Sequence, residues 1–179
     1  TTFKNAKTRL SPFLSEDERE KLLKVMLNDV TDTLKKYVDK MFIISRDKEV
    51  LSYAESLNVN AILENDNSNL NKALTQAMKL CKGKTRKIII VPSDIPLIGK
   101  TNVKMLIDAS KSLDFIIVPS KGGGTNMIIM KPMAIHTQFE GFSYKKHVRV
   151  AEKKNLNPQV HDSFFMALDV NTTEDLGEI

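Results

Sequence analysis

Residues 87–118 read KIIIVPSDIPLIGKTNVKMLIDASKSLDFIIV and contain two apolar runs separated by a helical pattern. The runs at 87–91 and 115–118 are made of β-branched and aromatic residues with few interruptions, which is typical of strands buried on both faces of a sheet. Residues 102–113 supply the helix between them. A strand, a helix and a second strand in this order favour an α/β domain with a largely parallel sheet.

The chain before this stretch follows the same alternation. Ser15 and Glu18 form a capping box, which predicts a helix from about residue 16 to residue 36. An apolar run at 41–44 and a strand at 59–63 are separated by a helical stripe over 50–57, and a further helical stripe over 70–81 ends at Gly83. The alternation of strands and helices extends the α/β pattern to the first half of the chain.

After residue 120 the pattern changes. A glycine-rich turn comes first, followed by a predicted strand at 126–130, a helix around 144–154 and a strand near 164–168. There is no linker, repeat or low-complexity stretch in the sequence, so we expect residues 1–179 to form a single domain.

The composition excludes several classes of protein. The sequence has 179 residues, of which 41% are hydrophobic and 27% charged, as in ordinary globular domains. Its longest apolar runs are about five residues, far short of the roughly 20 that a membrane span needs. The single cysteine, Cys81, cannot form an internal disulfide, and the first residues lack the apolar segment of a secretory signal. We therefore expect a protein of the reducing cytoplasm, without contact to a membrane.

The net charge of +5 is concentrated in two places. Residues 121–154 hold seven basic side chains and two acidic ones, and a smaller cluster consists of Lys4, Lys7 and Arg9. Localised positive sites fit a small polyanion such as a nucleotide phosphate at least as well as a duplex. Solvated lysine-rich faces are the alternative interpretation. A nucleic-acid-binding module is disfavoured because aromatic residues make up only 6% of the chain and none is tryptophan.

Ligands of open α/β sheets bind beyond the carboxyl ends of the strands, so residues that follow the apolar runs are candidates for a site. Asp94 follows the strand at 87–91 within a turn that contains two prolines, and could hold Mg²⁺ on a triphosphate or cap the next turn. Asp169 follows the predicted strand at 164–168 and would complete a site with two carboxylates. Thr172 and Asp175 form the cap of a terminal helix.

Two further segments could bind anions. Gly123 and Gly124 belong to the glycine-rich turn after the strand at 115–118, where successive N–H groups could cradle an anion while Thr125 and Asn126 add side-chain contacts. A mere tight reversal is the alternative. Residues 141–143 open the basic helix, so their amides form a second anion site.

The basic cluster near the N-terminus could grip phosphate oxygens as charge leaves the α-phosphorus, or be solvated. His136, His147 and His161 show neither metal-ligand spacing nor a paired nucleophile, and we interpret them as surface or packing residues.

Six ordered motifs together resemble the archaeal 2-phospho-L-lactate guanylyltransferases, over about residues 4–176. The motifs are AKTRLS at 6–11, LNKAL at 70–74, VPSDIPL at 91–97, GGTN at 123–126, GFS at 141–143 and DVNTTEDL at 169–176. The resemblance implies a three-layer α/β/α fold with a mostly parallel sheet, similar to the nucleotide-diphospho-sugar transferases and Rossmann-like. It also implies the reaction of GTP with 2-phospho-L-lactate to give lactyl-2-diphospho-5′-guanosine and pyrophosphate, in the biosynthesis of coenzyme F-420.

The resemblance also implies roles for individual residues. Asp94 and Asp169 would hold Mg²⁺, and Lys7 and Arg9 would be the catalytic cations, with Lys4 beside them in the same loop. The acceptor's carboxylate and phosphate would be bound by Thr125, Gly141 and Ser143. The nucleotide would be bound by Lys4, Asn71, Gly123, Gly124 and Asn126. Members of the family are commonly homodimers.

One departure concerns the start of the chain, because the family opens with a buried strand ahead of the basic loop and no such strand precedes Phe3. Alternatives remain open for the activity. A related nucleotidyltransferase of this fold could use phosphoenolpyruvate, 3-phosphoglycerate, a sugar phosphate or a molybdopterin as acceptor. A catalytically inactive scaffold could bind the nucleotide alone.

Overall fold

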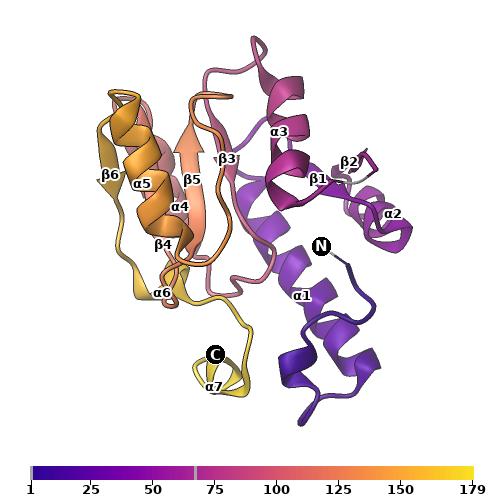
Figure 1. Cartoon of the computed structure of the whole chain (residues 1–179). Coiled ribbons are helices and arrows are strands. Elements are labelled where there is room, and N and C mark those ends of the chain that lie inside the picture. Colours follow the sequence, from indigo (N-terminus) through magenta and orange to yellow (C-terminus); the bar gives the residue numbers. More distant parts are fainter. Residues whose placement is uncertain (1, 67) are drawn as a thin grey trace.

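The structure is a computed structural model and describes residues 2–66 and 68–179. The helices and strands alternate along most of the chain, as Figure 1 shows. Their order is η1 (Thr8–Leu10, a 3-10 helix), α1 (Glu16–Leu34), β1 (Phe42–Ser45), α2 (Lys48–Ser56), β2 (Asn60–Leu63), α3 (Leu70–Cys81), β3 (Ile88–Ile90), α4 (Lys100–Ala109), β4 (Phe115–Pro119), β5 (Thr125–Met130), α5 (Ser143–Lys153), β6 (Pro158–Val160), α6 (Phe164–Ala167) and α7 (Thr173–Leu176).

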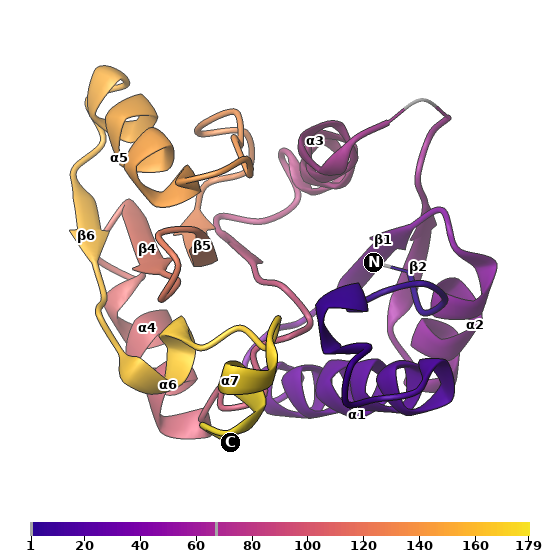
Figure 2. The ribbon, with the colours of Figure 1, turned by 60° about the horizontal axis from the view of Figure 1, so that its bottom comes forward.

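Within the described residues, the strands form two sheets. β1 and β2 pair in parallel, and the other sheet has the order β3-β5-β4-β6. β5 is antiparallel to both β3 and β4, while β6 is parallel to β4, so β3, β4 and β6 share one direction. In Figure 2, β1 and β2 lie with α1 and α2, apart from the sheet that contains β4, β5 and β6. The prediction of a mostly parallel sheet is confirmed, with β5 as the reversed strand.

Helices cover both faces of the larger sheet. Because side chains alternate along a strand, β4 contributes residues to two different cores. One face packs against α1 and α4 in a cluster that includes Val30, Val103, Ile116 and Ile129. The opposite face packs against α3 and α5 in a cluster that includes Met78, Phe115, Ile128 and Ala151. This arrangement confirms the three-layer α/β/α fold.

A third apolar cluster fixes the N-terminal segment. Phe3 and Leu10 are fully buried against α1 and α2, together with Val170 from the C-terminal segment. The backbone N–H of Phe3 also donates to Asp47 Oδ2 at 3.1 Å. Burying side chains of this size stabilises the fold by about 1.5–3 kcal/mol each. The loop between Phe3 and Leu10 is therefore held at both of its ends, and this loop carries Lys7.

The predicted start of α1 is confirmed in detail. Ser15 Oγ accepts a hydrogen bond from the Glu18 N–H at 3.3 Å, and the Glu18 carboxylate accepts one from the Ser15 N–H at 2.8 Å. The helix ends at Leu34, two residues before the predicted end. No helix within the described residues combines the length and the apolar content that a membrane crossing requires.

The predicted strand at 164–168 is wrong, because residues 164–167 form the helical turn α6. The Ser163 carbonyl accepts hydrogen bonds from the N–H groups of Met166 and Ala167 at 3.1 and 2.8 Å. Phe164 and Phe165 are 62% and 56% exposed, whereas Met166 is buried. A run of five apolar residues fits a short strand or a helical turn equally well, so periodicity could not separate the two.

The sixth strand lies elsewhere, in a segment that the sequence did not single out. β6 pairs with β4 on one side only, through Phe115–Pro158 and Ile117–Val160 register pairs. Proline is tolerated there because an edge strand can lack a backbone donor. β3 differs in another way from its prediction: its side chains are half-buried rather than buried, because it lies at the other edge of this sheet.

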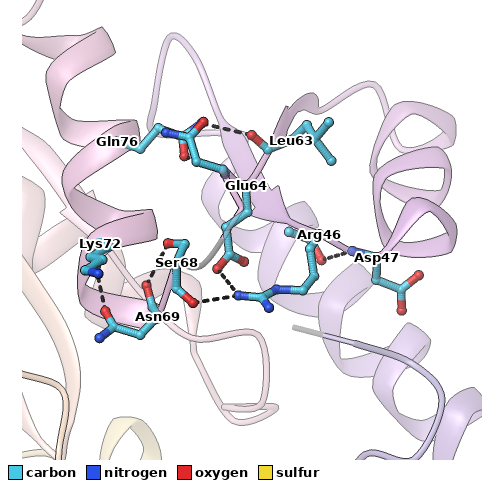
Figure 3. A network of polar contacts seen from close by, with 10 residues as sticks. Arg46, Asp47, Leu63, Glu64, Ser68, Asn69, Lys72 and Gln76 are labelled. Atoms are coloured by element: carbon cyan, nitrogen blue, oxygen red, sulfur yellow. Dashed lines mark hydrogen bonds and ion pairs between the residues drawn. The ribbon is translucent and has the colours of Figure 1, made fainter.

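A polar network joins the smaller sheet to α3, as Figure 3 shows. Arg46 follows β1 and donates through Nη2 to Glu64 Oε1 at 2.8 Å and to the Ser68 carbonyl at 2.7 Å. Within α3, Gln76 Nε2 donates to the Leu63 carbonyl at 2.9 Å. These bonds tie the carboxyl ends of β1 and β2 to the beginning of α3.

Candidate active site

Lys7 points into the interior of the molecule. It lies at the turn that begins η1 and has a left-handed backbone, with φ 51°. Its side chain is 9% exposed, and Nζ lies 2.5 Å from Asp94 Oδ2 and 2.8 Å from Asn171 Oδ1. These partners are 87 and 164 positions away in the sequence. The fold thus brings the N-terminal basic loop together with two segments that the sequence analysis selected separately.

Asp94 and Asp169 are neighbours. The Val170 N–H donates to the Asp94 carbonyl at 3.0 Å, which holds the two loops side by side. Burial raises the pKa of the Asp169 carboxyl, and the nearby charge of Asp94 raises it further. Asp169 follows the helical turn α6 rather than a strand, so the strand-end argument for it was wrong although it lies beside Asp94.

Asn171 connects these residues and was not selected from the sequence. Its side-chain Oδ1 accepts from Lys7 Nζ, while its Nδ2 donates to the Asp169 carboxylate. Its backbone N–H donates to Asp175 Oδ2 at 2.9 Å, within the cap that begins α7. The predicted helix cap at Thr172 and Asp175 is confirmed, and it fixes the loop that presents Asp169 and Asn171.

The donor set of this corner fits a hard divalent cation. In the part of the chain that the structure describes, no group of three or more His, Cys, Asp or Glu side chains forms a ready metal cage. Mg²⁺ commonly takes one or two protein carboxylates and completes its shell with waters and substrate phosphates. Two adjacent carboxylates, of which Asp169 has a pKa raised by burial and then by the charge of Asp94, are a pair that a divalent cation would stabilise.

The glycine-rich turn packs against the start of α5. The Gly123 carbonyl accepts from the Tyr144 N–H at 3.3 Å, and a Cβ added to Gly123 would lie 2.7 Å from Phe142 Cδ1. The N–H groups of Gly123 and Gly124 donate to the Ser120 carbonyl and to Ser120 Oγ, both at 2.9 Å. Because both amides are engaged within the turn, the predicted cradle of successive N–H groups is not formed. Gly123 instead provides close contact with Phe142, at φ 79°.

Thr125 and Ser143, which the resemblance assigned to the acceptor, meet in the structure. Ser143 is the first residue of α5 and Thr125 the first of β5, and both are buried. Their hydroxyl oxygens are 3.0 Å apart and hydrogen-bonded. Gly141 lies two residues before Ser143, with φ 57°, and its carbonyl accepts the Ser143 N–H at 2.7 Å.

His147 lies behind this hydroxyl pair and is fully buried. Its Nδ1 is 2.9 Å from Thr125 Oγ1, and its Nε2 accepts the Gln138 N–H at 2.8 Å. Burial lowers the pKa of the ring to about 4, with a smaller contribution from the charge of Lys146. The sequence alone indicates a surface or packing residue at this position. Its position four residues after Ser143 was the available signal, because residues at this spacing share one helix face.

The remaining cations of the N-terminal loop lie outside this arrangement. Lys4 is exposed and pairs with Glu49 of α2, with 2.9 Å between Nζ and Oε1. Arg9 is exposed and forms no ion pair within the described residues. The structure therefore brings Lys7 to the carboxylates, while Lys4 and Arg9 stay at the surface.

Asn71 and Asn126 support loops next to the candidate site. Asn71 Oδ1 accepts the Phe139 N–H at 2.8 Å and so holds the segment that leads to Gly141. Asn126 is buried, and its Nδ2 donates to the Met166 carbonyl at 2.9 Å. A hydrogen bond from the Asn126 side chain also lowers the pKa of Asp169, against the larger effect of burial.

Two hollows lie away from these residues. One of about 500 Å³ is between α1 and α2, and its lining includes Lys24, Glu49 and Tyr53. Another of about 330 Å³ lies where β3 and β4 begin, and its lining includes Arg86 and Lys131. None of the residues predicted for the site lines either hollow. We therefore locate the candidate site by the contacts among its side chains and not by a hollow.

Comparison with known proteins adds to this geometry. A family model described as "Guanylyl transferase CofC like" matches residues 1–179. The chain is 76% identical over 177 residues to the 2-phospho-L-lactate guanylyltransferase of Methanobrevibacter smithii, covering 99% of this chain and 79% of that protein. It is 49% identical to the protein of the same name from Methanothermobacter thermautotrophicus, over 99% of this chain and 79% of the relative.

Solved structures share the fold at low sequence identity. A crystal structure from Desulfovibrio desulfuricans G20, described as a nucleotide-diphospho-sugar transferase, superposes with a TM-score of 0.81 at 18% identity, over 98% of this chain and 81% of the other. The 4-diphosphocytidyl-2C-methyl-D-erythritol synthase of Anaerococcus prevotii gives a TM-score of 0.63 at 11% identity, over 88% of this chain and 86% of the other. Both are similar to this chain in fold.

Proposed function

The chain belongs to the family of CofC-like guanylyl transferases, and on this premise we propose that it transfers the guanylyl group of GTP to 2-phospho-L-lactate. The products are lactyl-2-diphospho-5′-guanosine and pyrophosphate, and the reaction serves the biosynthesis of coenzyme F-420. The proposal is carried by one observation, the contact of Lys7 with Asp94 and, through Asn171, with the Asp169 loop. A cation and two carboxylates in contact are what a triphosphate with its metal ion requires.

The reaction is an in-line displacement at the α-phosphorus. A phosphate oxygen of the acceptor forms the new bond, and the bond to the pyrophosphate oxygen breaks. An ionised phosphate needs no general base at neutral pH, so the residues bind, orient and neutralise charge instead of moving a proton. Lys7 supplies a buried positive charge next to the triphosphate, and Arg9, which is exposed two residues later, is proposed to reach the triphosphate from the solvent side.

Mg²⁺ is the proposed cofactor, and Asp94 and Asp169 are the residues that would hold it. When bound, the ion offsets the negative charge that builds up on the α-phosphate and the leaving pyrophosphate. Asn171 keeps the Asp169 carboxylate oriented through its amide, and Lys7 shares Asp94. The pairing of Lys7 with Asp94 also limits the charge repulsion between the two carboxylates.

The acceptor is proposed to bind at the Thr125–Ser143 hydroxyl pair and Gly141. The start of α5 attracts an anion because the N–H groups of a first helical turn carry partial positive charge. No side chain within the described residues caps this helix start, but the Ser143 and Tyr144 N–H groups donate to the carbonyls of Gly141 and Gly123. The acceptor is therefore proposed to bind through the Thr125 and Ser143 hydroxyls, with the helix dipole adding to the attraction. Asn71 supports the site from α3 by holding the segment before Gly141.

We place the enzyme in the cytoplasm. We also propose that it is a homodimer, and light scattering on the purified protein tests this oligomeric state.

The direct test is pyrophosphate release in the presence of Mg²⁺. Each of GTP, ATP, CTP and UTP is combined with 2-phospho-L-lactate, phosphoenolpyruvate or no acceptor. Release that requires both GTP and 2-phospho-L-lactate supports the proposal, and release with phosphoenolpyruvate alone assigns a different acceptor. No release in any combination, from protein with a cooperative unfolding transition, contradicts it.

A further inference from the structure

A chain of four hydrogen-bonding groups runs from the loop before α5 into the proposed acceptor site. The Gln138 N–H donates to His147 Nε2 at 2.8 Å. His147 Nδ1 is 2.9 Å from Thr125 Oγ1, and Thr125 Oγ1 is 3.0 Å from Ser143 Oγ. The Phe139 ring packs against the imidazole with 4.7 Å between the ring centres. The imidazole is thereby held by a hydrogen bond at each nitrogen and by the Phe139 ring on one side.

The first link of this chain fixes where the imidazole carries its hydrogen. A backbone N–H can only donate, so His147 Nε2 must present its lone pair. The ring hydrogen of the neutral imidazole is therefore on Nδ1, which donates to Thr125 Oγ1. Protonation of both nitrogens would break the bond from Gln138, and the buried position of His147 opposes it as well.

The tautomer determines how many hydroxyl hydrogens are left for a ligand. Thr125 and Ser143 have two hydroxyl hydrogens, and one of them occupies the bond between the two oxygens. Because His147 donates to Thr125, the other hydrogen is not needed inside the protein. With the hydrogen on Nε2 instead, Thr125 would donate to His147 and Ser143 to Thr125, and no hydrogen would remain. The tautomer deduced from the Gln138 contact makes the hydroxyl pair a net donor of one hydrogen bond.

A net donor at this place favours an anionic ligand group. Ser143 Oγ faces the glycine-rich turn, since a Cβ added to Gly124 would lie 3.8 Å from it. The pair is located at the first residue of α5, where the helix dipole is positive. Lys145 and Arg149 on the same helix are exposed and add to the positive field.

We infer that His147 is a positioning residue, which orients the Thr125 and Ser143 hydroxyls so that they donate to the carboxylate or phosphate of the acceptor. The inference rests on the proposed function for the identity of that acceptor. The donor count itself rests only on the contacts of Gln138, His147, Thr125 and Ser143. His147 contacts no reacting atom, and its effect is transmitted through Thr125.

Two substitutions of His147 separate orientation from packing. The side-chain amide nitrogen of Asn lies close to the place of Nδ1, so His147→Asn can still donate to Thr125 but loses the acceptor for Gln138. The amide oxygen of Gln lies close to the place of Nε2, so His147→Gln can still accept from Gln138 but loses the donor to Thr125. His147→Gln leaves one hydroxyl hydrogen of the pair free but no longer fixes its direction, so it should raise the KM for 2-phospho-L-lactate by about 10-fold, the lower end of the value of a hydrogen bond to a charged group.

The other kinetic constants provide the controls. In His147→Gln we expect both the KM for GTP and kcat to change by less than about threefold. In His147→Asn the KM for 2-phospho-L-lactate should stay within about threefold of the wild-type value. His136→Gln, at an exposed histidine of the preceding loop, should change none of these constants. Equal increases of the acceptor KM in the Asn and Gln variants would assign His147 a packing role and overturn the inference.

The tautomer can be measured without turnover. Imidazole ¹⁵N shifts of the folded wild-type protein should show a protonated Nδ1 and an unprotonated Nε2 at His147 near neutral pH. A hydrogen on Nε2 would refute the inference whatever the kinetics show. If no acceptor supports pyrophosphate release, the proposed function is wrong, and the ¹⁵N shifts still decide whether the hydroxyl pair is a net donor.

Discussion

Lowering the pH from about 7.5 to about 5 should destabilise the protein through His147. Burial and the charge of Lys146 lower the pKa of its ring from 6.5 to about 4 in the folded protein. In the unfolded chain the ring regains its ordinary pKa. Between these two values the unfolded state binds more protons than the folded state, so the free energy of unfolding falls as the pH falls. The contribution is fully present above pH 6.5 and is lost by about pH 4.

The expected magnitude follows from the two pKa values. Linkage gives a loss of about 2 kcal/mol between about pH 7.5 and about pH 5, and about 3 kcal/mol once the pH is below the folded-state pKa. Domains of this size commonly have a free energy of unfolding of about 5–15 kcal/mol, so the loss is measurable. The side chain is fully buried, and solvent screening therefore reduces the effect little.

Urea denaturation at several pH values can isolate this term. The carboxylates titrate in the same range, so the wild-type protein is compared with His147→Asn, which lacks the titrating ring. The difference between the two unfolding free energies should shrink by about 2 kcal/mol from about pH 7.5 to about pH 5. A difference that stays constant over this range would show that His147 has an ordinary pKa and is not desolvated as described.

Four other substitutions, one of them a control, test separate parts of the structure. Asp94→Asn should lower kcat by about 10²-fold or more with cooperative unfolding retained, and near wild-type turnover would exclude its metal role. Gly123→Ala should raise the acceptor KM because a Cβ there would displace Phe142. Gly83→Ala is the control, because Gly83 has a similar φ of 76° but open space around it. This control substitution should lower the free energy of unfolding by about 1 kcal/mol without a kinetic effect. Ser15→Ala should lower the free energy of unfolding by about 1 kcal/mol through loss of the cap, with unchanged kcat; a stability change below a few tenths of a kcal/mol would contradict the role of the capping box.

Much of the fold could be predicted because its elements carry local signals. The capping box at Ser15 and Glu18 and the apolar runs at 87–91 and 115–118 need no tertiary information, and helices and strands occur where these patterns indicated. The errors concern short elements. α6 has four residues and β6 has three, and at such lengths the period of the apolar pattern is not defined. β6 is a strand because β4 offers it an edge, which is a tertiary property.

The candidate site was predictable in its charged part and not in its hydrogen-bonded part. Asp94 stands out because it follows the apolar run at 87–91, and Lys7 because it belongs to a basic cluster with Lys4 and Arg9. Asp169 was selected for following a strand, but the run before it forms the helical turn α6. Asn171 and His147 do not stand out, since an amide or an imidazole is common on any surface. Their importance comes from partners 164 and 22 positions away, and only the folded chain defines those partners.

The two halves of the site handle charge differently. On the side of Lys7, full charges face one another: an ammonium group with 9% exposure touches a carboxylate, and a second carboxylate lies beside them. On the side of Thr125, the buried groups are neutral, because the ring that supports the hydroxyls holds no charge near pH 7. A triphosphate brings several negative charges, and the proposed site meets them with an ammonium group and with two carboxylates that would hold a metal ion. An acceptor that must attack with one of its own phosphate oxygens is better served by neutral donors, because they orient its anionic end without a strong ion pair that would hold the nucleophile back. Since His147 supplies this neutrality together with the direction of the hydrogen bonds, replacing it by a cation would alter both properties at once.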